Sequence, residues 1–323
     1  MKNKIPLVSV VMLNYNGLKY LKRTISPILK LDYPNYEFII VDNGSTDGSI
    51  EFIKKLKKIK LIENKENLGY GKGKNIGVKH AKGEFVLLLD NDIVINNFLL
   101  IKILLKYLHS LKNVSFLSFP MINDKEKKIK MYIYLYGLFG PVYNKEKEVK
   151  NIKSLSYFLT ASPLGGNIFF NRKIRNKIGD YDESQPYYLD DFDIGARSSI
   201  FGYDNYIITE DILTHLGDQG KNNLEVWSWK YNFFFSGMSR VIIKNYSLKN
   251  LMIIYPLFSI FALIKTLKYC IKFKSFNPIK SLIKSLSLFL GNLPDTLKQR
   301  KIIQSKRVIK EDIFLKIKPP KFD

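Results

Sequence analysis

The chain has 323 residues, of which 46% are apolar and 14% aromatic, so it can bury a full core in one large or two modest domains and is not expected to be disordered. Its net charge of +23 is uneven, because residues 1–220 carry 32 basic and 24 acidic side chains whereas residues 221–323 carry 20 and 5. The single cysteine, Cys270, excludes an internal disulfide and a multi-cysteine zinc site, which is typical of a reducing compartment such as the cytosol.

The first ninety residues alternate between short apolar runs and segments with helical spacing. The run at 7–13 is too short for a signal peptide and no small-residue cleavage site follows it, so we expect a buried strand there. In chain order the predicted elements are a strand at 7–13, a helix from 18 that ends before 32–34, a strand at 37–41, a helix at 49–58, a strand at 60–63, a glycine-rich loop at 67–73, a helix at 74–81 and a strand at 85–89. This alternation predicts an α/β protein with a doubly wound parallel sheet, in which ligands bind at the carboxyl ends of the strands.

Polar side chains follow three of these predicted strands. They are Asn14, Tyr15 and Asn16, then Asp42 and Asn43, then Asp90, Asn91 and Asp92. Two carboxylates one residue apart at a strand end suit a hard divalent cation such as Mg²⁺ or Mn²⁺, which prefers oxygen ligands and keeps positions for substrate phosphates. Such triplets also occur by chance in turns, and a loop like the one at Asp42, taken alone, is more often a helix-capping turn.

Acidic residues gather again after a Lys-rich segment at 123–153, which has no clean period and which we expect to be an insertion or a flexible loop. Asp190, Asp191 and Asp193 follow a first acidic stretch at 179–183. Because so many carboxylates would be costly to leave unpaired in a core, we expect them to rim a polar cleft.

Four motifs, in this order, resemble those of family 2 glycosyltransferases, especially the rhamnosyltransferase-type members. They are VSVVMLNYNG at 8–17, IIVDNGSTDGS at 39–49, ENLGYGKGKNIGVKHAKGEFVLLLDND at 66–92 and GGNIFFNRKIRNKIGDYDESQPYYLDDFDIGAR at 165–197. The resemblance implies the GT-A fold, a Rossmann-like mixed sheet flanked by helices. It also implies a catalytic domain at 1–220, with a nucleotide-binding half at 1–95 and an acceptor half at 96–220, followed by a basic helical region at 221–323.

The resemblance also implies roles for the polar residues on the donor side. Asp42 would bind the nucleotide base, with Tyr15 and Asn16 in the same pocket, and Asp90 would lie beside the ribose and donor sugar. Asp92 would hold Mg²⁺ or Mn²⁺. The remaining residues expected at the nucleotide sugar are Asn14, Asn43, Asn67, Lys74 and Asn91. His215 would approach the metal or the diphosphate, although an isolated histidine is as often an ordinary hydrogen-bonded residue.

On the acceptor side, Asp191 matches the general base of the family. Asp190 stands where the family has glutamate, and its shorter side chain reaches less far toward the acceptor. Gly165 and Gly166 would let the backbone approach donor or acceptor closely, or would simply form a tight turn. The implied reaction is metal-assisted and inverts the anomeric carbon in one displacement, because the hydroxyl attacks as Asp191 takes its proton.

The last third of the chain combines apolar runs with lysines. Residues 251–264 are uncharged but number only 14, against the 20 or so that cross a bilayer, so they are not expected to span one. Residues 278–290 place an apolar stripe on one helical face, with lysines elsewhere and no acidic residue between Glu225 and Asp295. The stripe consists of Ile279, Leu282, Ile283, Leu286 and Phe289. This pattern favours a helix lying on an anionic membrane, although the helices could instead pack on the catalytic domain.

The expected partners are therefore a nucleotide-sugar donor, a glycan or lipid-linked acceptor and an anionic membrane surface. Nucleic acid is not expected, because no recognition motif is present and arginine is scarce. We expect a cytoplasmic protein, peripheral on the cytoplasmic face of the membrane. The non-enzymatic alternative is a catalytically inactive module of the same fold that binds a membrane or nucleic acid.

Overall fold

The structure, a computed structural model, describes residues 5–124, 129–130, 134–137, 140–143, 154–184, 189–217 and 224–317. The Lys-rich segment at 123–153 that we expected to be an insertion or flexible loop lies mostly outside the described residues.

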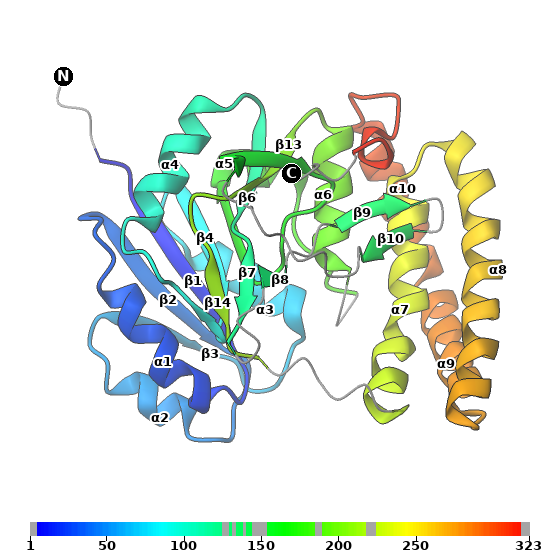
Figure 1. Cartoon of the computed structure of the whole chain (residues 1–323), viewed down its shortest axis with the longest axis horizontal. Coiled ribbons are helices and arrows are strands. Elements are labelled where there is room, and N and C mark those ends of the chain that lie inside the picture. The colour runs from blue at the N-terminus through cyan, green and yellow to red at the C-terminus, as the bar shows by residue number, and fades with distance from the viewer. Residues whose placement is uncertain are drawn as a thin grey trace.

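A central sheet of eight strands runs through the molecule in the order β11-β13-β6-β12-β4-β1-β2-β3 (Figure 1). The strands are β1 (Val8–Asn14), β2 (Tyr36–Asp42), β3 (Ile59–Glu63), β4 (Phe85–Asp90), β6 (Val114–Ser118), β11 (Tyr157–Thr160), β12 (Asn167–Asn171) and β13 (Asp204–Ile208). The parallel sheet predicted from the alternation is confirmed for β3, β2, β1 and β4. β12 runs antiparallel to both β4 and β6, so the sheet as a whole is mixed, as the family resemblance implies.

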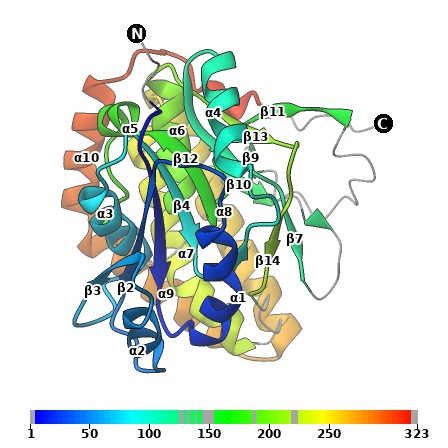
Figure 2. The same ribbon diagram turned by 90° about the vertical axis from the view of Figure 1, so that its left-hand side faces the viewer.

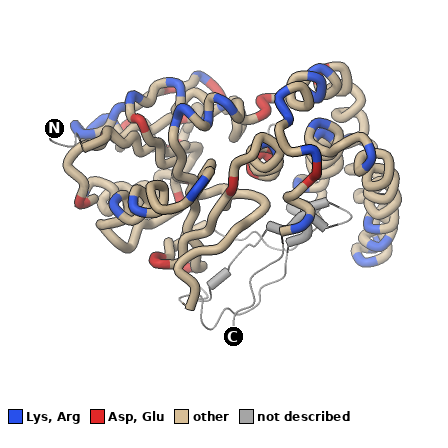
Figure 3. The backbone as a smooth tube through the Cα atoms, turned by 90° about the horizontal axis from the view of Figure 1, so that it is seen from above, with Lys and Arg blue, Asp and Glu red and all other residues tan. Residues whose placement is uncertain are grey.

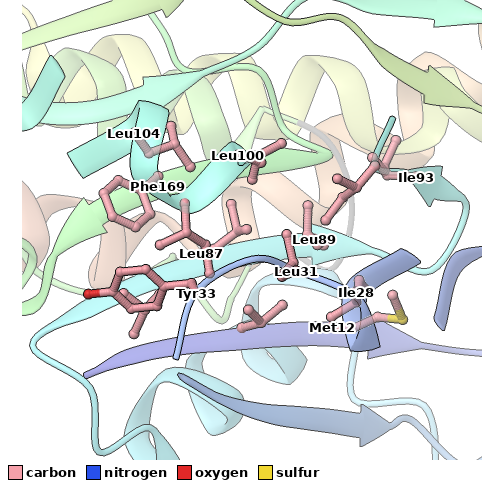
Figure 4. Close-up of a cluster of buried hydrophobic side chains, with 14 of the residues drawn as sticks. Met12, Ile28, Leu31, Tyr33, Leu87, Leu89, Ile93, Leu100, Leu104 and Phe169 are labelled. Atoms are coloured by element: carbon pink, nitrogen blue, oxygen red, sulfur yellow. The ribbon is translucent and has the colours of Figure 1, made fainter. Parts of the chain in front are cut away.

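Helices cover both faces of this sheet (Figures 1 and 2). They are α1 (Leu18–Leu29), α2 (Ser49–Lys54), α3 (Tyr70–His80), α4 (Leu100–Ser110), α5 (Arg172–Ile178) and α6 (Asp190–Ile200). Alternate residues of β4 point to opposite faces. Leu87 and Leu89 pack with α1 and α4 in the core of Figure 4, whereas Val86 and Leu88 pack with α3, α5 and α6.

A smaller sheet lies beside the main one, in the order β5-β14-β7-β8. Its strands are β5 (Ile93–Val94), β14 (Leu213–His215), β7 (Met121–Asn123) and β8 (Ile129–Lys130), and a separate hairpin joins β9 (Tyr134–Gly137) to β10 (Gly140–Tyr143). β14 pairs antiparallel with β5, so His215 lies opposite Ile93. This pairing brings a residue from late in the chain to the end of β4.

Two predicted boundaries in the first half are wrong. α3 begins at Tyr70, inside the predicted glycine-rich loop, because Gly73 and Gly77 let the helix lie directly on β1. A Cβ atom at Gly77 would lie only 2.4 Å from Cγ1 of Val11. α2 ends at Lys54 instead of residue 58, because a turn follows in which the amide of Ile59 donates to the carbonyl of Leu56 at 3.2 Å.

The basic last third forms a layer of helices beside the sheet (Figure 1). These are α7 (Leu224–Asn245), α8 (Leu248–Phe273), α9 (Asn277–Gly291) and α10 (Leu293–Ser305), followed by a short 3-10 turn at Ile313–Leu315. Phe192 and Ile200 of α6 share one hydrophobic core with Met238 of α7 and Phe258 of α8. The division at residue 220 stays a prediction, and this shared core spans it.

α8 is longer than the uncharged run counted in the sequence, because the helix continues through lysines to a length of 26 residues. By length and composition it could cross a membrane, and it is the one such helix in the part of the chain that the structure describes. Length alone therefore does not decide how α8 relates to a membrane. The burial of α8 and its contacts with neighbouring helices distinguish a helix that spans a membrane from one that packs on the protein.

Buried ion pairs hold the helical layer on the α/β part. Asp182 lies 2.7 Å from Nη2 of Arg240 and 2.6 Å from Nζ of Lys244, both on α7, and all three side chains are less than a tenth exposed. Lys244 also lies 3.0 Å from Oδ1 of Asp193, which pairs with Arg197 on its own helix, α6. Burial raises the pKa of Asp182, but the charges of Lys244 and Arg240 outweigh it and hold the pKa well below its usual value.

We expect Asp182→Asn to lower the free energy of unfolding by about 3 kcal/mol at neutral pH, because it leaves two buried cations short of a counter-charge. Because the folded-state pKa of Asp182 is depressed, its stabilisation is complete above the unfolded pKa and is lost as the pH falls through the folded pKa. Urea unfolding at several pH values measures the difference.

Asp32→Asn is the matched control, because it breaks the exposed pair with Lys102 and should cost less than about 1 kcal/mol. Equal losses in the two variants would contradict a structural role for the buried pairs.

Candidate functional site

Polar side chains meet where three adjacent parallel strands end. Asn14 ends β1, Asp42 ends β2 and Asp90 ends β4, and the register of the strands sets these ends side by side. Nδ2 of Asn14 donates to Oδ2 of Asp42 at 2.7 Å, and Nδ2 of Asn91 donates to Oδ1 of Asn14 at the same distance. A continuous line of hydrogen-bonded side chains therefore crosses this edge of the sheet.

The loop after β2 folds back on Asp42, which is fully buried. Ser45 donates to Asp42 from its amide at 2.7 Å and from its hydroxyl at 2.8 Å. The hydroxyl of Ser45 also accepts from the amide of Asn16 at 2.9 Å, and the ring of Tyr15 beside it is 48% exposed. Asp42 thus shapes the loop, while Tyr15 offers an open aromatic face. Sequence reasoning missed Ser45, although its spacing from Asp42 is typical of a side chain that closes a turn.

Asn43 and Asn67 fix the approach to α3. Nδ2 of Asn43 donates to Oδ1 of Asn67 and to the carbonyl of Gly69, each at 3.0 Å. Oδ1 of Asn67 also accepts from the amide of Gly69 at 2.9 Å. Both predicted site residues therefore lie at this edge, and the contacts of Asn43 are with the protein itself.

Lys74 supplies the positive charge of the site from inside the protein, with a side chain only 1% exposed. Its Nζ lies 3.0 Å from Oδ1 of Asp90 and 3.8 Å from the centre of the Tyr70 ring. The hydroxyl of Tyr70 donates to Oδ2 of Asp90 at 3.1 Å. Sequence reasoning missed Tyr70 because it fell in the predicted loop. If a helix had been predicted at Tyr70, its spacing of four residues from Lys74 would have indicated that the two side chains lie side by side.

Asp92 and His215 form a pair on the other side of Asp90. Nε2 of His215 lies 3.1 Å from Oδ2 of Asp92, and the amide of Leu216 donates to the carbonyl of Asp92 at 2.8 Å. Burial lowers the pKa of His215, but the hydrogen bond and charge of Asp92 raise it more, so the net direction is upward. The chain passes close to the carboxylate, because a Cβ atom at Gly217 would lie 2.4 Å from Oδ2 of Asp92.

This pair fits a divalent cation. One carboxylate and one imidazole are suitable donors, and Mg²⁺ and Mn²⁺ commonly take few protein ligands and fill their other positions with water and substrate phosphates. No group of three or more His, Cys, Asp or Glu residues that could hold a metal occurs in the described ranges. Asp92 and His215 could therefore supply two ligands to a cation whose other positions are filled by water or substrate.

Asp190 and Asp191 begin α6 and face the end of β4 across two glycines. An added Cβ atom at Gly165 would lie 1.9 Å from Oδ2 of Asp191, and one at Gly166 would lie 3.5 Å from Oδ2 of Asp90. Oδ1 of Asp191 and Oδ2 of Asp190 are buried and have no hydrogen-bond partner among the residues that the structure describes. The glycine pair therefore makes room for a carboxylate that the surrounding described residues do not satisfy.

The surroundings of Asp190 and Asp191 raise the pKa values of both carboxyl groups. Burial raises the pKa of Asp190 to about 6, against the opposing charge of Lys74. Burial and the charge of Asp190 together raise the pKa of Asp191 well above its usual value. A carboxylate with a raised pKa accepts a proton more readily, which suits a general base.

The comparisons with known proteins agree with the motifs. The model of the family described as "Glycosyl transferase family 2" matches residues 9–179. An uncharacterized glycosyltransferase of Haemophilus influenzae is 39% identical over 97 residues, which cover 29% of this chain and 39% of that protein. The chain therefore matches well under half the length of this curated relative.

Solved structures resemble the whole chain. TarS 1–349 of S. aureus, also solved with UDP-GlcNAc, has a TM-score of 0.59 at 17% identity and covers 96% of this chain and 90% of its own. The mannosyltransferase PcManGT of Pyrobaculum calidifontis, solved with GDP-Man and Mn²⁺, has a TM-score of 0.58 at 17% identity and covers 94% of this chain and 86% of its own. At these identities the likeness concerns the fold.

Proposed function

Because the chain belongs to glycosyl transferase family 2 and is a glycosyltransferase with the GT-A fold, we propose that it transfers a sugar from a nucleotide-sugar donor to a hydroxyl group of a glycan or lipid-linked acceptor, with inversion. One observation carries the proposal. The carboxylate of Asp191, whose Oδ1 has no hydrogen-bond partner among the described residues, lies next to Gly165, and the Lys74–Asp90 ion pair lies next to Gly166.

The donor would bind along the ends of β1, β2 and β4. The exposed ring of Tyr15, on the loop that Asp42 shapes, is suited to stack on a base. Asp92 and His215 would hold Mg²⁺ or Mn²⁺, which neutralises the charge that develops on a departing nucleoside diphosphate. Two structural neighbours bind such donors, UDP-GlcNAc in TarS and GDP-Man with Mn²⁺ in PcManGT, which supports this part of the proposal.

The acceptor would approach from the side of α6. Asp191 takes the proton of the acceptor hydroxyl while its oxygen attacks the anomeric carbon from the face opposite the diphosphate, and this single displacement inverts the centre. Asp190 is adjacent and mostly buried, so its side chain is better placed to raise the pKa of Asp191 than to reach far toward an acceptor. We further propose that the enzyme works in the cytoplasm, in keeping with its single cysteine.

We expect Asp191→Asn to lower kcat by about 10²- to 10⁴-fold, the usual contribution of a positioned general base, and to leave donor binding intact. A panel of nucleotide sugars that includes UDP-GlcNAc and GDP-Man identifies the donor, and titration with the corresponding nucleoside diphosphate and Mn²⁺ measures binding. In the unmodified enzyme kcat/KM should fall as the pH is lowered through the raised pKa of Asp191, because protonation removes the base.

Asp180→Asn, at an exposed carboxylate of the neighbouring acidic stretch, is the matched control and should keep full activity. Undiminished turnover by Asp191→Asn would show that another group is the base.

Removal of divalent metal should abolish transfer and also the stabilisation by nucleoside diphosphate. With Mn²⁺ present, a diphosphate at about 100 times its Kd should stabilise the fold by about 2.7 kcal/mol, and thermal unfolding measures this shift. Asp92→Asn should lose most of the shift, whereas Glu63→Gln, at the exposed end of β3, should keep it. The same shift in the presence of a chelator would contradict a metal at Asp92.

We expect Gly165→Ala to lower kcat by about 100-fold without changing the unfolding midpoint, because the added methyl group displaces the Asp191 carboxylate. Gly291→Ala at the end of α9 is the control, since nothing lies within 4 Å of its added methyl group. Steady-state kinetics with both variants checks the expectation, and normal kcat in Gly165→Ala would mean that the carboxylate is not held in the reactive position.

A further inference from the structure

The outward side of α8 is an apolar surface that the described residues leave exposed. Ile253, Ile260 and Ile264 are each more than half exposed, and Ile271 is 80% exposed. The other exposed apolar residues of α8 are Leu248, Met252, Leu257, Phe261, Leu263 and Leu267. A surface helix of a soluble domain normally turns polar residues outward, and a contiguous apolar face of this extent indicates an interaction site.

The charges around this face are all of one sign. Lys249 lies near its amino-terminal end, and Lys268, Lys272 and Lys274 lie exposed at its carboxyl-terminal end. No acidic residue occurs between Glu225 and Asp295, and basic residues predominate along the helical side of the molecule (Figure 3). An anionic surface complements this arrangement, whereas a second copy of α8 would bring lysines against lysines.

The inner side of α8 is hydrogen-bonded to α7, and buried ion pairs hold α7 on the α/β part. The hydroxyl of Tyr231 on α7 donates to the carbonyl of Ala262 at 2.9 Å and lies 2.9 Å from the hydroxyl of Thr266. α7 in turn is held by the buried pairs of Arg240 and Lys244 with Asp182. A spanning α8 would have to break these contacts or draw α7 into the lipid, so α8 is suited to lie along a bilayer and not to cross it.

α9 contributes less than its sequence suggested. The predicted helix at 278–290 is confirmed, but Phe289 is buried and Ser285 accepts from the amide of Ser236 on α7 at 2.9 Å. Ile283 and Leu286 remain exposed beside α8, with Lys280 and Lys284 on the same helix. The apolar surface is therefore built mainly on α8 and is extended by α9.

The position of this surface relates it to the catalytic site. The carboxyl-terminal end of α8 and the beginning of α9 lie toward the same end of the molecule as the carboxyl ends of β1, β2 and β4, at the bottom of both views (Figures 1 and 2). α8 itself runs along the side of the molecule, so a membrane on its outward face would lie beside this end of the sheet and not across it (Figure 1).

We propose that α8 docks in the plane of an anionic lipid bilayer, with its outward apolar face in the lipid and the lysines at its ends on the headgroups. Docking would hold the enzyme at the bilayer in which a lipid-linked acceptor is anchored, a consequence that rests on the proposed transferase function. The docking itself depends only on the surface of α8 and α9.

Flotation with vesicles of phosphatidylcholine and phosphatidylglycerol tests the docking on the full chain without any donor. Ile260→Gln combined with Ile264→Gln should weaken binding by about 100-fold or more, because two exposed isoleucines no longer enter the lipid. Lys268→Gln combined with Lys272→Gln should weaken it by about 30-fold on the anionic vesicles, at about tenfold or less for each lysine.

Matched controls carry the same chemical changes elsewhere. Ile302→Gln with Val308→Gln removes two exposed apolar residues from the α10 end, and Lys57→Gln with Lys58→Gln removes two exposed lysines from the α/β part. Both controls should bind vesicles like the unmodified chain. All variants should keep the metal-dependent shift by nucleoside diphosphate, which reports on the catalytic site separately.

Four results would overturn the proposal. They are absence of binding to anionic vesicles by the unmodified chain, equal binding by the α8 variants, retention in the vesicles after alkaline carbonate, which would indicate a spanning helix, and a lower solution mass of the isoleucine variant, which would indicate a second copy on this face. Vesicle binding that persists in Asp191→Asn would show that docking stands even where the proposed chemistry fails.

Discussion

One buried ammonium group lies among the carboxylates that meet at the edge of the sheet where β1, β2 and β4 end. Nζ of Lys74 pairs with Asp90 and its charge opposes the rise in pKa of Asp190 and Asp191. Burial nevertheless leaves the pKa values of Asp90, Asp190 and Asp191 raised, because like charges in a poorly solvated site cannot all stay ionised. Asp90 is ion-paired with Lys74, whereas Oδ1 of Asp191 has no hydrogen-bond partner among the described residues. The site thus combines an ion-paired carboxylate with a basic one.

α6 connects this edge to the rest of the molecule. Asp191 in its first turn lies against Gly165, whereas Asp193 pairs with Lys244 of α7 and Phe192 packs in the core shared with the helical layer. The position of the base therefore depends on contacts made by the last third of the chain. This dependence is a physical reason why the helical layer belongs to the same folded unit as the sheet.

Much of the site could be predicted from the sequence because it lies at the ends of buried strands. Asp42, Asp90 and Asp92 directly follow apolar runs, and parallel strands bring such ends together whatever the rest of the chain does. The distant partner of Asp92 was predictable only from the family resemblance, since nothing local to His215 announces that β14 pairs with β5. Tyr70 was missed because the glycines around it indicated a loop, so a helix beginning at Tyr70 was not predicted.

The helical layer shows where sequence patterns stop being informative. α8 is apolar around most of its circumference, so its sequence alone is equally consistent with a buried helix, a spanning helix and a helix on a surface. Only packing distinguishes these cases. Phe258 and Ala262 are buried against neighbouring helices, while Ile260 and Ile264 on the other side are open to solvent. The striped segment at 278–290 was easier to interpret from sequence, yet α8 carries the larger exposed apolar surface.

The glycines of α3 have a consequence for the electrostatics of the whole edge. Because Gly73 and Gly77 bring the helix backbone against side chains of β1, main-chain packing sets where the Lys74 side chain starts, and the side chain extends from there to the Asp90 carboxylate. A Cβ atom at Gly73 would lie 2.5 Å from Cδ1 of Leu13, and one at Gly77 would lie 2.4 Å from Cγ1 of Val11, so a bulkier residue at either position requires those side chains or the helix to shift. Two positions that bear no side chain thus contribute to where the cation stands relative to the carboxylates of a different element, α6.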